Sequence, residues 1–219
     1  MILAIDTTHP FGSMALLADG EILEETLLHS EEGFGHILYG HLAGILDRQA
    51  CRIQEVDCFA AAAGPGSFTG VRIGLACVKG LAEATGKPVA PVSNLQAIAA
   101  FGTGPFRATV LDARRGEIYG AVYDAELNPL TPEVVMPLPD WLRTLPASPV
   151  EFITMDFEGF HSALKGTAFA ASKVIEAPKT LAAAIARIAE SKLREGLAVP
   201  AEHVDANYIR RSDAELLWK

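Results

Sequence analysis

An order of predicted elements that occurs twice constrains the fold of this chain most. Residues 2–6 (ILAID) predict a buried strand, and 12–18 and 21–29 predict two further strands that flank the hairpin signal Asp19-Gly20. Helices and strands alternate after this three-stranded meander. In order they are a helix, a strand, a helix, a short strand and a helix, predicted at 36–48, at 58–63, from a glycine-rich turn to about Ala84, at 88–93 and from Asn94.

The second half repeats this outline more faintly. Residues 106–112 (FRATVLD) predict a strand that ends in an aspartate, as ILAID does, and 117–124 (EIYGAVYD) predict the strand that follows it. Weaker signals come next: a short helix around Trp141, a strand at 149–156 and an Ala-rich helix at 181–195. The repeat therefore predicts a duplicated α/β architecture.

The duplication predicts two lobes, residues 1–103 and 104–219, with the polar tail (200–219) packing back on the first lobe and ending in a short helix. Asp6 and Asp112 end the first strand of each lobe. Open α/β sheets bind ligands at the carboxyl ends of their strands, so the two aspartates mark a candidate ligand edge. Strand-ending aspartates are also common in ordinary turns, and the pattern leaves both interpretations open.

Composition and charge narrow the function classes. The formal net charge is −9. Because an acidic surface repels a phosphate backbone, we do not expect this chain to bind nucleic acid by itself. No apolar run is long enough for a membrane span, and the N-terminus lacks the basic region of a signal peptide. The three cysteines have no CxxC spacing, which favours buried thiols in a reducing compartment. We expect a cytoplasmic globular protein.

The segment GPGSFTGVRIG, residues 64–74, is the most informative stretch. It is neither a P-loop, because no GK[ST] follows, nor a GxGxxG motif. Ser67 and Thr69 can cap the start of the following helix, and free amides there could hold an anion. The other interpretation is that the glycines only permit a tight turn and close packing. The candidate anion-loop residues are Gly64, Pro65, Gly66, Ser67, Thr69 and Arg72.

The helix after this motif is apolar around most of its girth, because its charged residues, from Arg72 to Glu83, form one narrow stripe. The helix at 36–48 carries Gly40 and Gly44, and each interior Gly costs about 1 kcal/mol relative to Ala. Either the two helices satisfy each other within the chain, or they form a seam with a second chain. The candidate interface residues are His36, Leu38, Gly40, His41, Gly44, Ile45, Phe68, Gly70, Val71, Gly74, Leu75 and Val78.

The sequence does not favour a metal site or a nucleophile. His36 and His41 are five residues apart, whereas a zinc-binding pair on one helix face needs a spacing of four. No GxSxG elbow and no Ser/His/Asp order is present. We therefore expect no metal and no catalytic residue in this chain.

Together with ILAIDTT at the start, DARRGEIY at 112–119 and NYIRR at 207–211, the motif GPGSFTGVRIG resembles the TsaB (YeaZ) family of bacterial tRNA threonylcarbamoyladenosine biosynthesis proteins. The resemblance covers most of the chain, is strongest over 1–120 and is nearly absent over 129–199. It implies an actin-like ATPase-domain fold (ASKHA, RNase H-like), whose two lobes are built from a duplicated β-β-β-α-β-α unit.

The resemblance also implies a role as a partner subunit without catalytic residues. TsaB-type proteins support a larger catalytic paralogue of the TsaD type, together with a small TsaE-type ATPase. The assembly transfers threonylcarbamoyl from threonylcarbamoyl-AMP to the adenosine 3′ of the anticodon in tRNAs that read ANN codons. The TsaB-type subunit is expected to bind the paralogue through helices of its first lobe, to form a homodimer when alone and to reach tRNA only through the complex.

Two departures from related proteins bear on catalysis. The TsaD type carries an HxxxH metal pair on its first helix, and the segment FGHILYGH lacks it. Actin-like kinases have DxG[ST] at the end of their first strand, whereas Asp6 is followed here by TTHPFGS. We therefore interpret Asp6, Thr7, Thr8 and Asp112 as a vestigial nucleotide cleft. No ATP, ADP or other cofactor is expected. The alternatives are a small actin-like ATPase or kinase acting alone, or a metalloprotease-like protein, which would need a metal.

Overall fold

The structure, a computed structural model, describes residues 1–146, 149–155 and 157–210. The chain divides into two compact units, Met1–Ala97 with Pro178–Asn207 and Ile98–Ala177 with Tyr208–Lys219. The segment 178–207, which falls within the second lobe expected from the sequence, therefore packs with the first unit. The helix predicted at the end of the chain lies outside the described residues.

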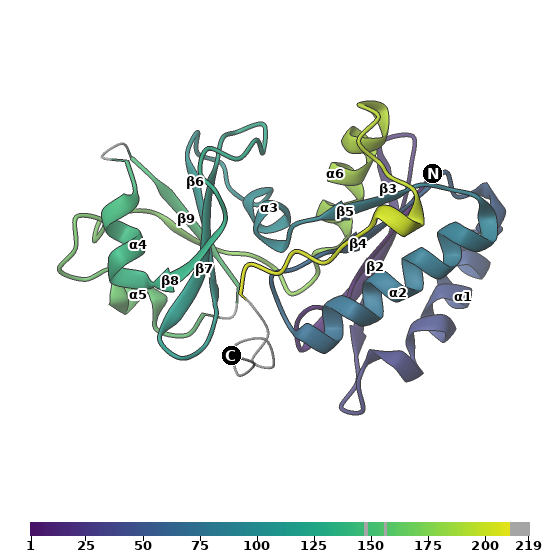
Figure 1. The fold of residues 1–219 in the computed structure, drawn as a ribbon, viewed down its shortest axis with the longest axis horizontal. Helices are drawn as coiled ribbons and strands as arrows, with labels where there is room; N and C mark the ends of the chain where they lie inside the picture. The colour runs from purple at the N-terminus through teal and green to yellow at the C-terminus, as the bar shows by residue number, and fades with distance from the viewer. Residues whose placement is uncertain (147–148, 156, 211–219) are drawn as a thin grey trace, which may run out of the picture. The chain divides into compact units, whose positions relative to one another are not determined.

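The first unit is built on a five-stranded sheet of order β3-β2-β1-β4-β5 (Figure 1). β1 pairs antiparallel with β2 and parallel with β4, while β2–β3 is antiparallel and β4–β5 parallel. The strands are β1 Ile2–Asp6, β2 Phe11–Ala18, β3 Glu21–His29, β4 Cys58–Ala62 and β5 Val89–Val92.

Helices cover both faces of this sheet. Alternate residues of β1, Leu3 and Ile5, join the core cluster under α1 and α2, which lie side by side in Figure 1. Ala4 points to the other face, where α6 packs on β1, β2 and β4. Ser13 fixes the start of α6, because its Oγ accepts hydrogen bonds from the Leu181 and Ala182 amides at 3.0 Å. The elements are α1 Leu38–Arg48, α2 Phe68–Thr85, α3 Asn94–Ala99, α6 Ala182–Arg194 and the 3-10 turns η1 Phe34–His36, η2 Ile53–Glu55 and η3 Ala201–His203.

The second unit repeats the sheet with order β10-β9-β6-β7-β8, so that β6 pairs antiparallel with β7 and parallel with β9, as β1 does with β2 and β4. The remaining pairings also correspond, with β7–β8 antiparallel and β9–β10 parallel. The predicted duplicated α/β architecture is thus confirmed. The elements are β6 Arg107–Asp112, β7 Glu117–Tyr123, β8 Val134–Pro137, β9 Glu151–Thr154, β10 Val174–Glu176, α4 Leu138–Thr144 and α5 Phe160–Ala163.

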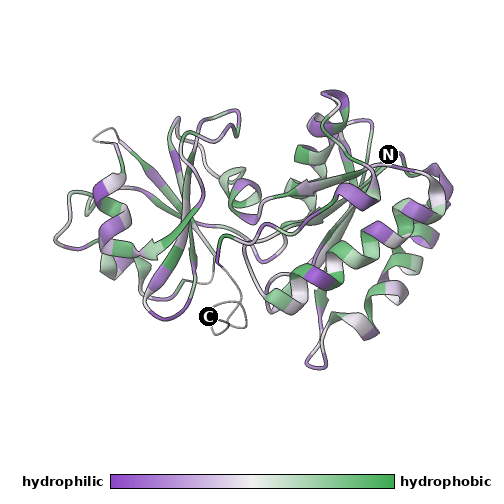
Figure 2. Cartoon of the chain, in the orientation of Figure 1, coloured by the Kyte–Doolittle hydropathy of each residue, from purple (hydrophilic) through white to green (hydrophobic). Residues whose placement is uncertain are grey.

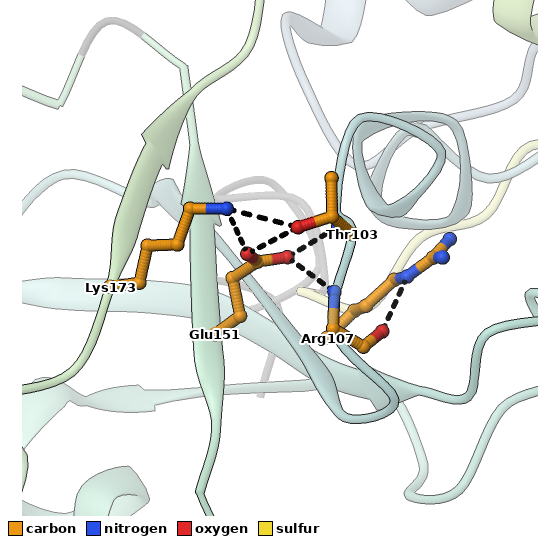
Figure 3. Close-up of polar contacts among 5 residues, drawn as sticks. Thr103, Arg107, Glu151 and Lys173 are labelled. Carbon is orange, nitrogen blue, oxygen red and sulfur yellow. Dashed lines mark hydrogen bonds and ion pairs between the residues drawn. The ribbon is translucent and has the colours of Figure 1, made fainter.

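A buried carboxylate fixes the entry into the second sheet (Figure 3). Glu151, at the start of β9, accepts hydrogen bonds from the amides of Thr103 and Gly104 at 2.6 and 3.0 Å and pairs with Lys173 Nζ at 2.7 Å. Arg107 Nε donates to the Gly104 carbonyl at 3.0 Å from the other side. Burial raises the pKa of Glu151, but the hydrogen bonds from Lys173, Gly104 and Thr103 outweigh burial and lower it to about 2.

Candidate partner-binding surface and motif loop

The motif segment 64–74 forms the turn from β4 into α2. Ser67 caps the helix, since its Oγ accepts from the Gly70 amide at 3.3 Å, as the sequence predicts. Thr69 lies within the first turn of α2 and is not the cap. Gly64 has φ +105, a backbone conformation that other residues rarely adopt.

The motif loop is tied to the end of β1 by one connected hydrogen-bond network. Thr8 donates from its amide and its Oγ1 to Asp6 Oδ1, at 2.9 and 2.6 Å. Asn94 Nδ2 donates to Thr8 Oγ1 at 2.5 Å, and Asn94 Oδ1 accepts from the Gly64 amide at 2.9 Å. The Ser67 amide donates to the Thr8 carbonyl at 2.8 Å. Asn94 was not among the predicted site residues, because its local sequence indicates only the start of a helix.

The motif glycines allow α2 to lie directly against the loop after β1. A Cβ at Gly70 would stand 1.9 Å from the Thr7 carbonyl oxygen, and one at Gly74 would stand 2.8 Å from Thr7 Oγ1. Thr7 Oγ1 also donates to the Gly70 carbonyl at 2.7 Å. At Gly66 a Cβ would lie 2.8 Å from the Thr8 Cβ. Close packing within the chain therefore accounts for these three glycines.

The amides of Gly64, Ser67 and Gly70 donate hydrogen bonds within the chain. Because these N–H groups already donate within the chain, fewer backbone donors are left to bind the anion that the sequence predicts as one possibility for this loop. Arg72, which the sequence adds to the same loop, places its guanidinium 3.8 Å from the centre of the Phe68 ring. The anion loop stays a prediction.

Asp6 and Asp112 have different surroundings in their own units. Asp6 is fully buried, and its Oδ2 has no hydrogen-bond partner among the described residues. Asp112 is exposed, and its Oδ1 accepts from the Arg114 amide at 2.7 Å. The vestigial nucleotide cleft that would use both aspartates stays a prediction.

Much of the expected partner seam is buried inside the first unit. α2 turns one apolar face onto its own sheet, and its glycines approach the Thr7 loop, so these side chains form core and not surface. They are not exposed in the first unit, and the partner interface that the sequence indicates stays a prediction. The buried residues are Leu38, Ile45, Gly70, Val71, Gly74, Leu75 and Val78. The remaining candidates, which are exposed or half-buried, are His36, Gly40, His41, Gly44 and Phe68.

A second face of the two helices is exposed and carries aromatic and very small side chains, with the charged Arg72 and Glu83 on the same side of α2. We call it the α1/α2 face and define it by Tyr39, Gly40, Ala43, Phe68, Ala76 and Gly80. Tyr39 is 61% exposed and Phe68 45% exposed. In Figure 2 both helices carry green and white stretches interrupted by purple bands, so apolar colouring extends along each helix.

Nothing among the described residues explains the glycines of this face. A Cβ at Gly40 or at Gly80 would meet nothing within 4 Å, and one at Gly44 would meet only the Arg48 side chain. Tyr39 lies beside Cys77 of α2, whose thiol raises the pKa of Tyr39. The two helices therefore contact each other beneath the face while the glycines stay open above it.

The part of the chain that the structure describes holds no group of three His, Cys, Asp or Glu residues that could hold a metal ion. Nor does any helix within those ranges have the length and apolarity required to cross a membrane.

The chain shows clear similarity to known proteins over most of its length. The model of the TsaD family, described as tRNA N6-adenosine threonylcarbamoyltransferase, matches residues 35–218. The Bacillus subtilis (strain 168) tRNA threonylcarbamoyladenosine biosynthesis protein TsaB is 32% identical over 162 residues, which span 71% of each chain. The chain belongs to the TsaB family. The Escherichia coli (strain K12) TsaB is 37% identical over 131 residues, 58% of this chain and 56% of that one.

Solved structures support the same TsaB (YeaZ) relationship. An uncharacterized Pseudomonas aeruginosa protein with similarity to peptidase YEAZ superposes with a TM-score of 0.81 at 26% identity, covering 95% of this chain and 99% of that one. A structure of YeaZ from Pseudomonas aeruginosa gives a TM-score of 0.74 at 25% identity, covering 94% and 98%. The two duplicated sheets form the actin-like ATPase-domain (ASKHA, RNase H-like) fold that the resemblance implied. As a TsaB family member, the chain takes part in tRNA threonylcarbamoyladenosine biosynthesis.

Proposed function

We propose that this chain is a TsaB-type subunit without catalytic residues that binds a TsaD-type catalytic paralogue through the α1/α2 face. In that complex it supports transfer of threonylcarbamoyl from threonylcarbamoyl-AMP to the adenosine 3′ of the anticodon in tRNAs that read ANN codons. A TsaE-type ATPase completes the set. The chain forms a homodimer when alone, reaches tRNA only through the complex and acts in the cytoplasm.

The observation that carries the proposal is the exposed α1/α2 face. Tyr39 and Phe68 expose large aromatic surface, which is enriched at protein interfaces. Gly40 and Gly80 lie in helices at positions where Ala would be more stable by roughly 0.5–1 kcal/mol, and its Cβ would meet no described atom within 4 Å. Small residues let a second helix approach to about 8 Å between axes. A partner helix seated on this face would explain both features.

The sequence of α1 supports the absence of catalysis. An HxxxH metal pair is the catalytic feature expected of the TsaD type on this helix, and this chain has His36 and His41 five residues apart. Asp6, one of the candidates for nucleotide chemistry, uses Oδ1 to hold Thr8 in place. Both features fit a subunit that positions a partner.

A matched pair of charge insertions tests the surface. Ala76→Arg places a long cation on the α1/α2 face, whereas Ala125→Arg makes the same change at an exposed turn of the second unit. Both positions are exposed, so both variants should fold. Size-exclusion chromatography with light scattering should show a complex with a TsaD-type protein for the wild type and for Ala125→Arg.

For Ala76→Arg we expect pairing to weaken at least about tenfold, because an unpaired charge is desolvated at the centre of the seam. Gly40→Arg should have the same effect from the α1 side. Equal pairing of Ala76→Arg, Gly40→Arg and Ala125→Arg would show that the partner binds elsewhere. If the wild type does not pair at all, the proposal as a whole fails.

A further inference from the structure

The turn that joins β6 to β7, two paired strands of the second unit in Figure 1, has an unusual backbone. Arg114, Arg115 and Gly116 follow one another in the left-handed region, with φ of 64, 58 and 77°. Glycine adopts this region freely, and Asn and Asp are the other residues found there most often. Two consecutive arginines are therefore an unfavourable choice for the backbone of this turn.

Contacts from within the second unit fix the turn in this conformation. Asp112 Oδ1 accepts from the Arg114 amide at 2.7 Å, and the Glu117 amide donates to the Arg114 carbonyl at 3.1 Å. Arg210 reaches the turn from the far end of the sequence. Its Nη1 donates to the Ala113 carbonyl at 2.6 Å, and its Nη2 pairs with the Glu117 carboxylate. The fold thus holds two arginines in a strained turn.

The two turn arginines lie at the surface. The Arg114 side chain is 85% exposed, and its Nη1 stands 3.9 Å from Asp112 Oδ2, which is a loose ion pair. Arg115 is also exposed. Glu117, the second carboxylate of the turn, is paired with Arg210. Among these described groups, three guanidiniums stand against two carboxylates, so the turn is locally positive on a chain of formal net charge −9.

The combination of strain and exposed charge indicates an anionic ligand. Strained residues persist where the surrounding structure holds them, and they often cluster at functional sites. Asn would fit the left-handed region at lower cost, so the backbone of the turn does not favour arginine. A guanidinium binds phosphate through two parallel N–H groups, and adjacent arginines offer two such forks. Because both side chains are exposed on a turn, they can reach successive phosphates of a nucleic-acid backbone.

We propose that the β6–β7 turn contacts the phosphate backbone of the tRNA while the chain is held in its complex. Arg114 and Arg115 each pair with a phosphate. The inference rests on the proposed function, which supplies the RNA substrate and the partner proteins. The acidic chain as a whole repels RNA, so the two contacts add affinity to the complex and are too few to hold tRNA on the isolated chain.

Binding of tRNA by the assembled complex tests the turn. The double variant Arg114→Asn, Arg115→Asn and the wild type would each be combined with a TsaD-type protein and a TsaE-type ATPase. Filter binding of a tRNA that reads ANN codons would be followed over about 50–200 mM salt. We expect binding to weaken at least about fivefold and the slope of log affinity against log salt to become shallower by about 1–2. Equal binding or an unchanged slope would overturn the proposal.

Thermal stability separates a ligand contact from a role in the fold. Because Asn tolerates the left-handed turn better, the melting temperature of the double variant should be unchanged or higher by up to about 4 °C. Weaker tRNA binding together with a lower melting temperature would assign the arginines to the fold and sink the proposal. Arg114→Lys combined with Arg115→Lys keeps the charge, so it should restore most of the salt slope but less of the affinity.

A matched control removes two exposed arginines elsewhere. The side chains of Arg52 and Arg143 are 78% and 75% exposed, and Arg52→Gln combined with Arg143→Gln should change tRNA binding less than about twofold. A loss equal to that of the turn variant would refute a specific contact.

Light scattering with the TsaD-type protein distinguishes this inference from the proposed function. If the wild type does not pair, the proposed function fails and this inference falls with it. If the turn variant pairs normally but binds tRNA as tightly as the wild type, only this inference fails. If the turn variant itself no longer pairs, the turn is a protein contact and the RNA proposal is wrong.

Discussion

Gly70 offers the sharpest test of how the motif loop is built. In the Gly70→Ala variant the new Cβ would stand 1.9 Å from the Thr7 carbonyl oxygen, whereas ordinary contacts begin at 3.4 Å. The obstacle is backbone, so the start of α2 or the loop after β1 must move by about 1.5 Å. That movement also breaks the hydrogen bond from Thr7 Oγ1 to the Gly70 carbonyl and the one from the Ser67 amide to Thr8.

The expected magnitude follows from these contacts. Overpacking at a buried site costs about 1–3 kcal/mol or more, and a lost internal hydrogen bond costs about 1 kcal/mol. The helix propensity of Ala returns roughly 1 kcal/mol. We therefore expect Gly70→Ala to lower the free energy of unfolding by about 2–4 kcal/mol.

Gly80→Ala is the matched control, because it makes the same change in the same helix where a Cβ meets nothing within 4 Å. We expect it to raise the free energy of unfolding by roughly 0.5–1 kcal/mol. Urea denaturation followed by far-ultraviolet circular dichroism gives both values. If Gly70→Ala and Gly80→Ala agree to within about 1 kcal/mol, the close approach of α2 to Thr7 is wrong.

Two further predictions concern ionisable groups. The pKa of Glu151 is about 2 in the folded chain against an ordinary 4.5, so the folded state holds the proton less tightly than the unfolded state. Its contribution is therefore complete above pH 4.5 and is lost as pH falls toward 2. After allowance for screening, Glu151→Gln should cost roughly 1–2 kcal/mol at pH 7 in urea denaturation and much less near pH 2, and a pH-independent difference would contradict this. Burial raises the pKa of Cys58 and Cys77 to about 11, so a thiol reagent at pH 8 should label half-buried Cys51 rapidly and the other two slowly; three equal rates would be inconsistent with the fold.

The local signals in the sequence predicted most strands. β1 and β3 begin and end where the predictions 2–6 and 21–29 place them, because buried apolar runs and the Asp19-Gly20 hairpin signal are local. β8 and β10 were missed. Both are short, of four and three residues, and their apolar runs, 134–136 and 174–175, are shorter than the run of at least about four residues that predicts a strand.

The candidate site shows the limit of such reasoning. The Ser67 cap was predictable, since capping joins residues three apart. The close contact that requires a glycine at position 70 was not predictable, because Thr7, which Gly70 contacts, lies 63 residues away in the sequence. A glycine required for contact inside the chain and one left open for a partner, such as Gly40, look alike in sequence. Only the tertiary structure separates them.

Reconstitution of tRNA modification tests the central claim most directly. A TsaD-type protein, a TsaE-type ATPase, threonylcarbamoyl-AMP and a tRNA that reads ANN codons would be combined with or without this chain. We predict that modification requires this chain, that the chain alone modifies nothing, and that Ala76→Arg fails to support the reaction where Ala125→Arg succeeds. Transfer by this chain alone, or an undiminished reaction when it is omitted, would contradict its role as a partner subunit.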